Sequence, residues 1–168
     1  MMRPCTPADA AQILEVINDG ADAYRGVIPP DCWHDPYMAE SELQRELAAG
    51  VRFWCVEDEG RINAVMGIQD VLDVALIRHA YTRTSTQGRG LGSRLLAHLR
   101  NTTDRRILIG TWAAASWAVR FYQGRGFELV TPIEKERLLK RYWTVSDRQI
   151  TESVVLRSSA ASMPSVTK

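Results

Sequence analysis

A turn with three glycines, Gln87-Gly88-Arg89-Gly90-Leu91-Gly92, follows a run of β-forming residues that ends near Arg83. A helical pattern begins at its end, near Leu91. The first amides of a helix have no partner within the helix and lie at the positive end of its dipole. A glycine-rich turn entering a helix can therefore bind phosphate oxygens through its backbone. We expect an α/β protein whose turn holds a phosphate-bearing ligand.

Two common glycine motifs fit this turn poorly. The dinucleotide motif G-x-G-x-x-G, begun at Gly88, would require a third glycine where the chain has Ser93. That motif also normally belongs to the first strand-helix-strand unit of its domain, whereas here a long segment precedes it. A P-loop would need Lys-Ser or Lys-Thr after its last glycine, and the chain has Ser93-Arg94. Taken alone, the turn is also compatible with an exposed strand-to-helix connection that binds nothing.

A second segment makes the turn more specific. The turn resembles the acyl-CoA signature Q/R-x-x-G-x-G/A of the GNAT superfamily of N-acetyltransferases, here Gln87-x-x-Gly90-x-Gly92. Residues 118–127 resemble the second motif of that family, A-x-x-F-Y-x-x-x-G-F. Both motifs stand in the family's order and at its usual separation, and the resemblance covers roughly residues 6–156. It implies the GNAT fold, an α/β (α+β) architecture with a mixed, mostly antiparallel central sheet, splayed in the middle, and helices on both faces.

Composition and length narrow the class further. A chain of 168 residues is long enough for one well-buried core, so we expect a single domain at 1–157 and a disordered tail at 158–168. The net charge is +1 and there is no run of basic residues, which argues against binding of nucleic acid or of a membrane surface through a polybasic segment. No apolar stretch approaches the ~20 residues that span a bilayer. Three widely spaced cysteines favour reduced thiols in the cytoplasm. Cys32 and His34 lack a second ligand pair, so we expect no metal.

The hydrophobic periodicity, together with residues that typically start or end helices and strands, predicts the order of secondary-structure elements. Helices are expected to start at Thr6, ending at 18–20, and at Ser41, where a capping box precedes a helix that Gly50 ends. A loop rich in proline and aromatic residues lies between them, at 24–37. The remaining predictions are strands at 51–57, 62–69 and 74–83, a helix from 91, a strand at 107–112, a helix at 116–123, a strand at 127–130, a helix at 133–142 and a strand at 150–156.

The resemblance implies acetyl-CoA as co-substrate and assigns residues to it. In the family, main-chain groups of the strand before the turn hold the pantetheine arm, the turn amides face the pyrophosphate, and Arg89 would add positive charge. Many members carry an asparagine where this chain has Ala115, so the Ser116 hydroxyl is a candidate replacement. The predicted cofactor-binding residues are Tyr81, Thr82, Arg83, Gln87, Gly88, Arg89, Gly90, Leu91, Gly92, Ser93 and Ser116.

The implied reaction is direct acetyl transfer to a primary amine of a small molecule or peptide. Tyr122 occupies the family's general-acid position, and a phenol is a sensible proton donor to the departing thiolate. Core packing beside Phe121 is the alternative role for this ring. A backbone N–H near Thr82 would stabilise the oxyanion. His79 is a candidate base because histidine side chains in general can accept a proton near neutral pH, although a strand bulge could redirect it and a structural role is the alternative.

The acceptor end is predicted from aromatic residues of the 24–37 loop and of the strand that ends at 112. Tyr24, Trp33, Tyr37 and Trp112 are the predicted substrate-binding residues. The same rings could instead complete the core or form a dimer surface, and a homodimer is compatible with the resemblance. Two other functions stay open at this point: a catalytically silent acyl-CoA-binding or sensor domain, and a nucleotide-binding regulatory module.

Overall fold

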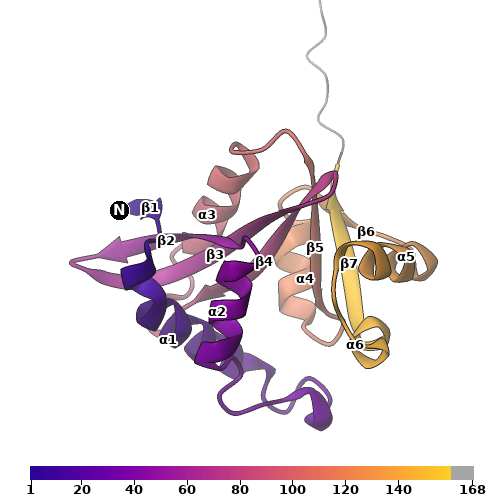
Figure 1. The fold of residues 1–168 in the computed structure, drawn as a ribbon, viewed down its shortest axis with the longest axis horizontal. Helices are drawn as coiled ribbons and strands as arrows, with labels where there is room; N and C mark the ends of the chain where they lie inside the picture. Colours follow the sequence, from indigo (N-terminus) through magenta and orange to yellow (C-terminus); the bar gives the residue numbers. More distant parts are fainter. Residues whose placement is uncertain (160–168) are drawn as a thin grey trace, which may run out of the picture.

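The computed structural model describes residues 1–159, and residues 160–168 lie outside the described part. Seven strands form one sheet in the order β1-β2-β3-β4-β5-β7-β6 (Figure 1). Every neighbouring pair is antiparallel except β4 and β5, which run parallel. This arrangement confirms the predicted mixed, mostly antiparallel sheet. The strands are β1 (Met2–Pro4), β2 (Arg52–Asp58), β3 (Arg61–Val71), β4 (Val74–Thr82), β5 (Arg106–Trp112), β6 (Phe127–Leu129) and β7 (Ser153–Ser158).

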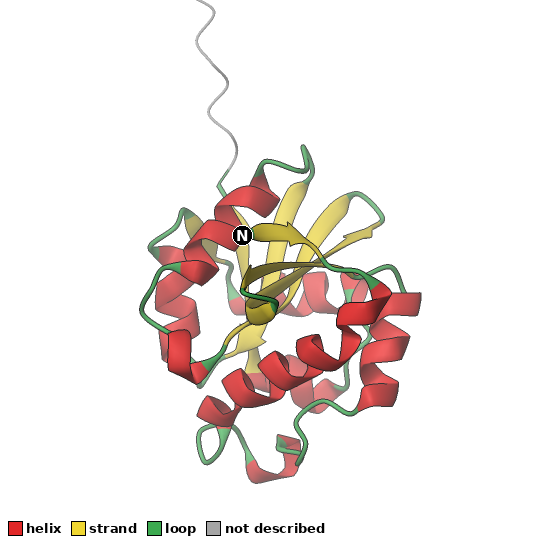
Figure 2. Cartoon of the chain, turned by 90° about the vertical axis from the view of Figure 1, so that its left-hand side faces the viewer, coloured by secondary structure: helices red, strands yellow, loops and turns green. Residues whose placement is uncertain are grey.

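Helices cover both faces of this sheet (Figures 1 and 2). On one face, apolar residues of α1 and α2 pack in a single cluster with residues of β2 and β3. On the other face, leucines of α3 and the ring of Tyr122 from α4 pack against β3, β4 and β5. A third cluster joins α5 and α6 to β5 and β7. The helices are α1 (Ala10–Ala21), α2 (Glu40–Ala48), α3 (Leu91–Arg100), α4 (Ser116–Gln123), α5 (Pro132–Tyr142) and α6 (Asp147–Glu152).

The sheet opens between its two parallel strands. The ladder of β4 and β5 runs only from the pair Val74 and Arg106 to the pair Ile77 and Ile109. Beyond these residues the two strands are no longer paired, as the predicted splay requires. The second half of β4 therefore pairs with β3 alone, and its other edge is available to a ligand.

Several predicted boundaries are wrong, and the physical reasons are local. The second helix begins at Glu40 after Ala39, not at a Ser41 capping box. The amide side chain of Asn18 holds both backbone groups of Met38, at 2.8 and 3.0 Å, which fixes the chain just before this earlier start. Residues 150–152, predicted as strand, end helix α6, and β7 then runs to Ser158, one residue into the predicted tail. The rest of that tail, from 160, lies outside the described residues.

One strand was not predicted, and the first helix ends later than predicted. The short strand β1 pairs with β2, its Arg3 opposite Cys55. The first helix also continues past the predicted stop at 18–20 and ends at Ala21. Gly20 sits there against β4, because an added Cβ would lie 3.1 Å from the Cβ of Tyr81. Within residues 1–159, no helix has the length and apolar character needed to cross a membrane.

Candidate active site

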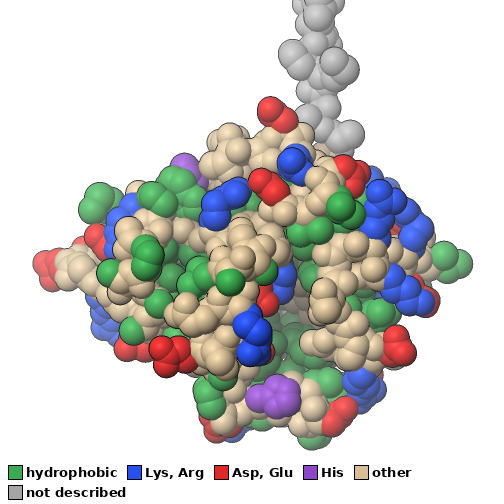
Figure 3. Space-filling view, viewed as in Figure 1, with side chains coloured by type: hydrophobic (Ala, Val, Ile, Leu, Met, Phe, Trp, Pro, Cys, Tyr) green, Lys and Arg blue, Asp and Glu red, His purple; other side chains and the backbone are tan. Residues whose placement is uncertain are grey.

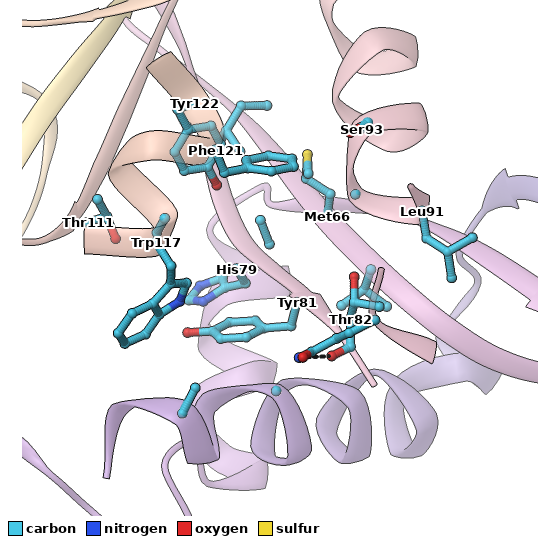
Figure 4. A pocket seen from close by; sticks show the side chains of 18 of the residues that line it. Met66, His79, Tyr81, Thr82, Leu91, Ser93, Thr111, Trp117, Phe121 and Tyr122 are labelled. Atoms are coloured by element: carbon cyan, nitrogen blue, oxygen red, sulfur yellow. Dashed lines mark hydrogen bonds between the residues drawn. The ribbon is translucent and has the colours of Figure 1, made fainter. Parts of the chain in front are cut away.

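A cavity of about 810 Å³ occupies the opening between β4 and β5. Its walls come from the end of α1, from β3, β4 and β5, from the glycine turn and from α3 and α4. The surface is hollowed near the middle of the view in Figure 3. In the close-up of Figure 4, Leu91 and Ser93 lie toward one end, and Trp117 and Thr111 toward the other. The glycine turn, which is predicted to bind the cofactor, and Tyr24, which is predicted to bind the acceptor, therefore line the same cavity.

The glycine turn enters α3 through a left-handed residue. Gly90 has φ +74° and is the residue immediately before the helix, and Gly88 has φ +79°. A Cβ at either position would meet no atom within 4 Å, so glycine is needed for the backbone angle rather than for space. The first helical hydrogen bond runs from the Arg94 amide to the Gly90 carbonyl at 3.1 Å. The backbone amides before Arg94 have no partner within the helix. Because the turn lines the cavity, these amides are available to a ligand there.

The third glycine of the turn has a different role. A Cβ on Gly92 would lie 3.4 Å from the Phe121 ring, so this position sets how closely α3 packs on α4. Leu91, Gly92 and Ser93 all line the cavity. The small size of Gly92 therefore permits the close approach of α3 to α4, while Leu91 and Ser93 remain next to the cavity.

Arg125 is a cavity-lining cation that the sequence analysis missed. Its Nε donates to the Ser93 hydroxyl at 2.7 Å, and one terminal nitrogen donates to the Phe121 carbonyl at 2.9 Å. The guanidinium also lies 3.9 Å from the centre of the Phe121 ring. These contacts hold a positive charge beside the first turn of α3. The available signal was its place inside the second motif, between Gly124 and Gly126.

Three predicted cofactor residues do not line the cavity. The Arg83 side chain points elsewhere, donating to the Ile62 carbonyl at 2.6 Å and pairing with Glu15 at 3.0 Å. Arg89 and Ser116 are exposed. The positive charge at this cavity thus comes from Arg125 rather than from Arg83 or Arg89. The remaining predicted cofactor residues line it: Tyr81, Thr82, Gln87, Gly88, Gly90, Leu91, Gly92 and Ser93.

Tyr122 lies on the buried face of α4. Its ring makes edge contacts with Phe121 and Phe127, at centroid distances of 5.1 and 6.0 Å, and the residue is 6% exposed. The hydroxyl nevertheless points into the cavity (Figure 4). Burial raises the pKa of this phenol, with a smaller contribution from Tyr24. The group therefore stays protonated at neutral pH and is suited to donate a proton.

A β-bulge sets the direction of His79. Arg78 pairs with Gly67 and Tyr81 with Val65, so His79 and Ala80 together face the single residue Met66. His79 has a left-handed backbone, φ +54°. Such a conformation is costly for a residue other than glycine and is concentrated at functional sites. The imidazole lines the cavity, lies over Phe53 at a centroid distance of 6.0 Å, and places Nε2 3.1 Å from a Glu46 carboxylate oxygen.

The predicted acceptor residues form two layers. Tyr24 lines the cavity together with Trp117, which stacks on it at a centroid distance of 5.9 Å. Tyr37 and Trp33 lie behind, with Tyr37 5.5 Å from Tyr24 and 5.6 Å from Trp33. Trp112 donates its indole N–H to the Tyr37 hydroxyl at 2.9 Å and does not itself line the cavity. Burial raises the pKa of Tyr37 to about 12.

The described residues do not gather ligands for a metal. Among residues 1–159, no three His, Cys, Asp or Glu side chains come together in a group that could hold an ion. The side chains that line the cavity are apolar and aromatic groups, hydroxyls, one amide, one histidine and one arginine.

Comparison with known proteins agrees with the motifs and the fold. Residues 49–129 match the family described as an acetyltransferase (GNAT) domain. This segment runs from the end of α2 to β6 and contains the glycine turn, the bulged β4 and Tyr122. No match was found among curated proteins.

Solved structures of GNAT acetyltransferases share the fold over nearly the whole chain. One from Staphylococcus aureus has a TM-score of 0.70 at 13% identity, over 94% of this chain and 97% of the other. The PaiA N-acetyltransferase of Thermoplasma acidophilum, solved with coenzyme A, has a TM-score of 0.70 at 11% identity, over 95% and 98%. A ribosomal-protein-alanine N-acetyltransferase from Brucella melitensis has a TM-score of 0.64 at 15% identity, over 94% and 98%.

Proposed function

The chain belongs to the GNAT acetyltransferases through the domain at residues 49–129, and from this premise we propose that it transfers an acetyl group from acetyl-CoA to a primary amine of a small molecule or peptide. One observation supports this most strongly. The Tyr122 hydroxyl opens into the same cavity as the glycine turn and the edge of β4 that β5 leaves unpaired. The turn proposed to bind phosphate, an unpaired backbone edge and the phenol proposed as proton donor thus surround one space.

The residues of the cavity fit acetyl-CoA from one end to the other. The turn amides and the Arg125 guanidinium would hold the pyrophosphate, because both supply positive potential at the start of α3. The free edge of β4, around Tyr81 and Thr82, would hold the pantetheine arm through main-chain hydrogen bonds. The volume of about 810 Å³ lies within the range of cavities that bind molecules of this kind.

The proposed chemistry follows from the groups around the thioester. The amine nitrogen attacks the carbonyl carbon, and a backbone N–H of the bulged part of β4 stabilises the resulting oxyanion. The carbon–sulfur bond then breaks, and Tyr122 gives its proton to the sulfur. His79, which also lines the cavity, accepts the proton that the nitrogen loses. This leaves an amide, free coenzyme A, a tyrosinate and a protonated His79; the imidazolium releases its proton to solvent and the tyrosinate takes one up, which restores both side chains.

The proposal is tested by measuring thiol release from acetyl-CoA with a panel of amines. Tyr122→Phe should lower kcat about 100-fold, as removal of a general acid does, with little change in the KM for acetyl-CoA. Tyr142→Phe is the matched control, because that phenol hydrogen-bonds to Asp73 and does not line the cavity. Wild-type turnover by the Tyr122 variant would exclude the proposed acid. Binding of acetyl-CoA without turnover on any amine would favour the silent sensor domain.

Two further parts of the proposal concern the cell and the assembly. All three cysteines are free, as expected of a protein in the reducing cytoplasm. A homodimer is compatible with the exposed Trp117 at the cavity mouth, and light scattering of the purified chain would test it. A monomer with full activity would exclude a catalytic need for the dimer.

A further inference from the structure

We infer that the acceptor is an aryl amine, a flat aromatic compound whose reacting nitrogen is uncharged at neutral pH. This inference rests on the proposed acetyl transfer and narrows its substrate class. Two independent features of the cavity carry it. The first is the geometry of an aromatic wall formed by Tyr24, Tyr81 and Trp117. The second is that four carboxylates in neighbouring segments are already paired with cations.

The wall presents ring surfaces to the end of the cavity away from the glycine turn. Trp117 is 40% exposed and stacks on Tyr24, with an angle of 27° between the rings. Tyr81 meets Tyr24 edge to face at 6.2 Å and 74°. Figure 4 shows Trp117 and Tyr81 at this end, below Tyr122. These rings can contact a flat aromatic ligand both by stacking and edge to face, the two arrangements that aromatic pairs prefer.

Four carboxylates in the segments next to this end have cationic partners. Asp22 and Asp35 pair with Arg25 at 3.0 and 3.5 Å. Asp31 pairs with Arg148 at 3.1 Å, a contact that ties the 24–37 loop to α6. On the other side of the wall, Glu46 contacts both Arg78 and His79. An ammonium group that approached any of these four carboxylates would have to compete with the cation already paired with it.

The charge of the nitrogen decides whether it can react. Burying an ammonium group costs free energy unless a carboxylate pairs with it. Aromatic ring faces that attract the ammonium stabilise the protonated form of the amine. That form has no lone pair for the attack. An aryl amine is uncharged near neutral pH, because its ring delocalises the lone pair and makes its conjugate acid a strong one. It enters without a charge and needs no proton removal before it attacks.

The surrounding phenols complete the recognition. Burial raises the pKa of both Tyr24 and Tyr81, so both hydroxyls remain protonated and neutral. A phenol hydroxyl can accept a hydrogen bond from an amine N–H and donate one to a ring substituent. Thr111 adds a third hydroxyl to the cavity lining.

The transfer balances without any further reactant. The neutral nitrogen forms a bond to the carbonyl carbon as the C=O electron pair moves to oxygen. The nitrogen, now cationic and strongly acidic, loses its proton to His79 or to water. The oxyanion collapses, the carbon–sulfur bond breaks, and the sulfur takes the Tyr122 proton. The products are an anilide and free coenzyme A.

The test compares two isomers and a ring-free amine at pH 7: 4-methylaniline, benzylamine and hexylamine. The first two share one formula and one ring, but only benzylamine is charged. Thiol release is corrected for the reaction without enzyme. We expect kcat/KM for 4-methylaniline to exceed that for benzylamine at least about tenfold. It should stay level from pH 6.5 to 8, whereas the benzylamine value should rise about tenfold per pH unit, following its free-base fraction.

Trp117→Leu provides the second measurement. It should lower kcat/KM for 4-methylaniline about tenfold, which corresponds to one lost aromatic contact, and leave the acetyl-CoA KM unchanged. Benzylamine or hexylamine used as well as 4-methylaniline at pH 7 would overturn the aryl-amine inference while leaving the acetyltransferase proposal in place. No thiol release with any amine, in the broad panel or among these three, would overturn both.

Discussion

A carboxylate oxygen of Glu46 lies 3.1 Å from Nε2 of His79, across the gap between α2 and the bulge in β4. The same oxygen lies 3.0 Å from the guanidinium of Arg78, the residue before the histidine. Neighbouring residues of a regular strand point to opposite faces, so the bulge is what brings both side chains to one carboxylate. Burial by itself would raise the pKa of Glu46, but its contacts with His79 and Arg78 outweigh burial and lower it.

This contact makes Glu46 a positioning residue for His79. Glu46→Gln keeps the size of the side chain but removes the charge that faces the imidazole, and we expect about a tenfold fall in kcat with acetyl-CoA affinity unchanged. His79→Ala should lose at least as much, and the double variant should lose no more than His79→Ala alone. Steady-state kinetics and calorimetric titration with acetyl-CoA separate these effects. Full additivity of the two losses would show that the residues act independently.

The turn offers a matched pair of glycines for a binding test. Gly90 and Gly60 have φ +74° and +79°, and a Cβ at either would meet no atom within 4 Å. Alanine at each position should cost about 1 kcal/mol of unfolding free energy, through the backbone alone. Only Gly90→Ala should also raise the KM for acetyl-CoA, about tenfold, because only Gly90 lines the cavity. Equal KM values for the two variants would remove the turn from the cofactor site.

Arg125 permits a second comparison within one segment. Arg125→Met should raise the KM for acetyl-CoA about tenfold, the effect of losing one charge-assisted contact to a phosphate, and the increase should shrink as salt is added. Arg120→Met, on the exposed side of α4, is the control and should leave the KM unchanged. Acetyl-dephospho-coenzyme A, which lacks the 3′-phosphate but keeps the pyrophosphate and the thioester, identifies the contacted group. A loss of the Arg125 effect with that analogue would move the contact to the 3′-phosphate.

The parts of this structure that the sequence predicted are those set by local chemistry. The positive φ values at Gly88 and Gly90 require glycine, so the turn is visible as a motif. Helix α4 at Ser116–Gln123 was predicted with its observed bounds. The strands predicted at 51–57 and 62–69 form the hairpin of β2 and β3, and Glu59 and Gly60 in its turn both have left-handed backbones. At each of these positions, residues close in sequence determine the conformation.

The parts that sequence reasoning missed depend on tertiary contacts or on a misread pattern. Arg125 reaches the cavity because Ser93, on another helix, anchors it. The Arg83 side chain contacts the Ile62 carbonyl and Glu15, which the sequence did not reveal, while contact of its main chain with the cofactor stays a prediction. The sequence does contain a start signal for helix α6, the capping box of Ser146 and Gln149. The β-branched residues that follow this signal favoured a strand instead. The bulge at His79 has no local sequence signature, because it is defined by its register with β3.

Acid stability gives a prediction that is independent of catalysis. Asp9 accepts two hydrogen bonds from the Arg3 guanidinium, at 2.8 and 3.0 Å, and one from the Thr6 amide at 2.7 Å. Arg3 is the main cause that lowers the pKa of Asp9 from 3.8 to about 2, against the opposing effect of burial. Because the folded pKa is depressed, the unfolded chain binds the proton more tightly. The resulting stability is present above about pH 4 and is lost as the pH falls toward 2.

Asp9→Asn should therefore lower the unfolding free energy at pH 7 by about 1–2 kcal/mol, and the difference from wild type should close between pH 4 and 2. Asp35→Asn is the control, because its pairing with Arg25 is exposed and should contribute less than about 0.5 kcal/mol at either pH. Urea unfolding followed at pH 7, 4 and 2.5 measures both. A difference for Asp9→Asn that stays constant over this range would mean that its contribution is packing or helix capping rather than the charge held by Arg3.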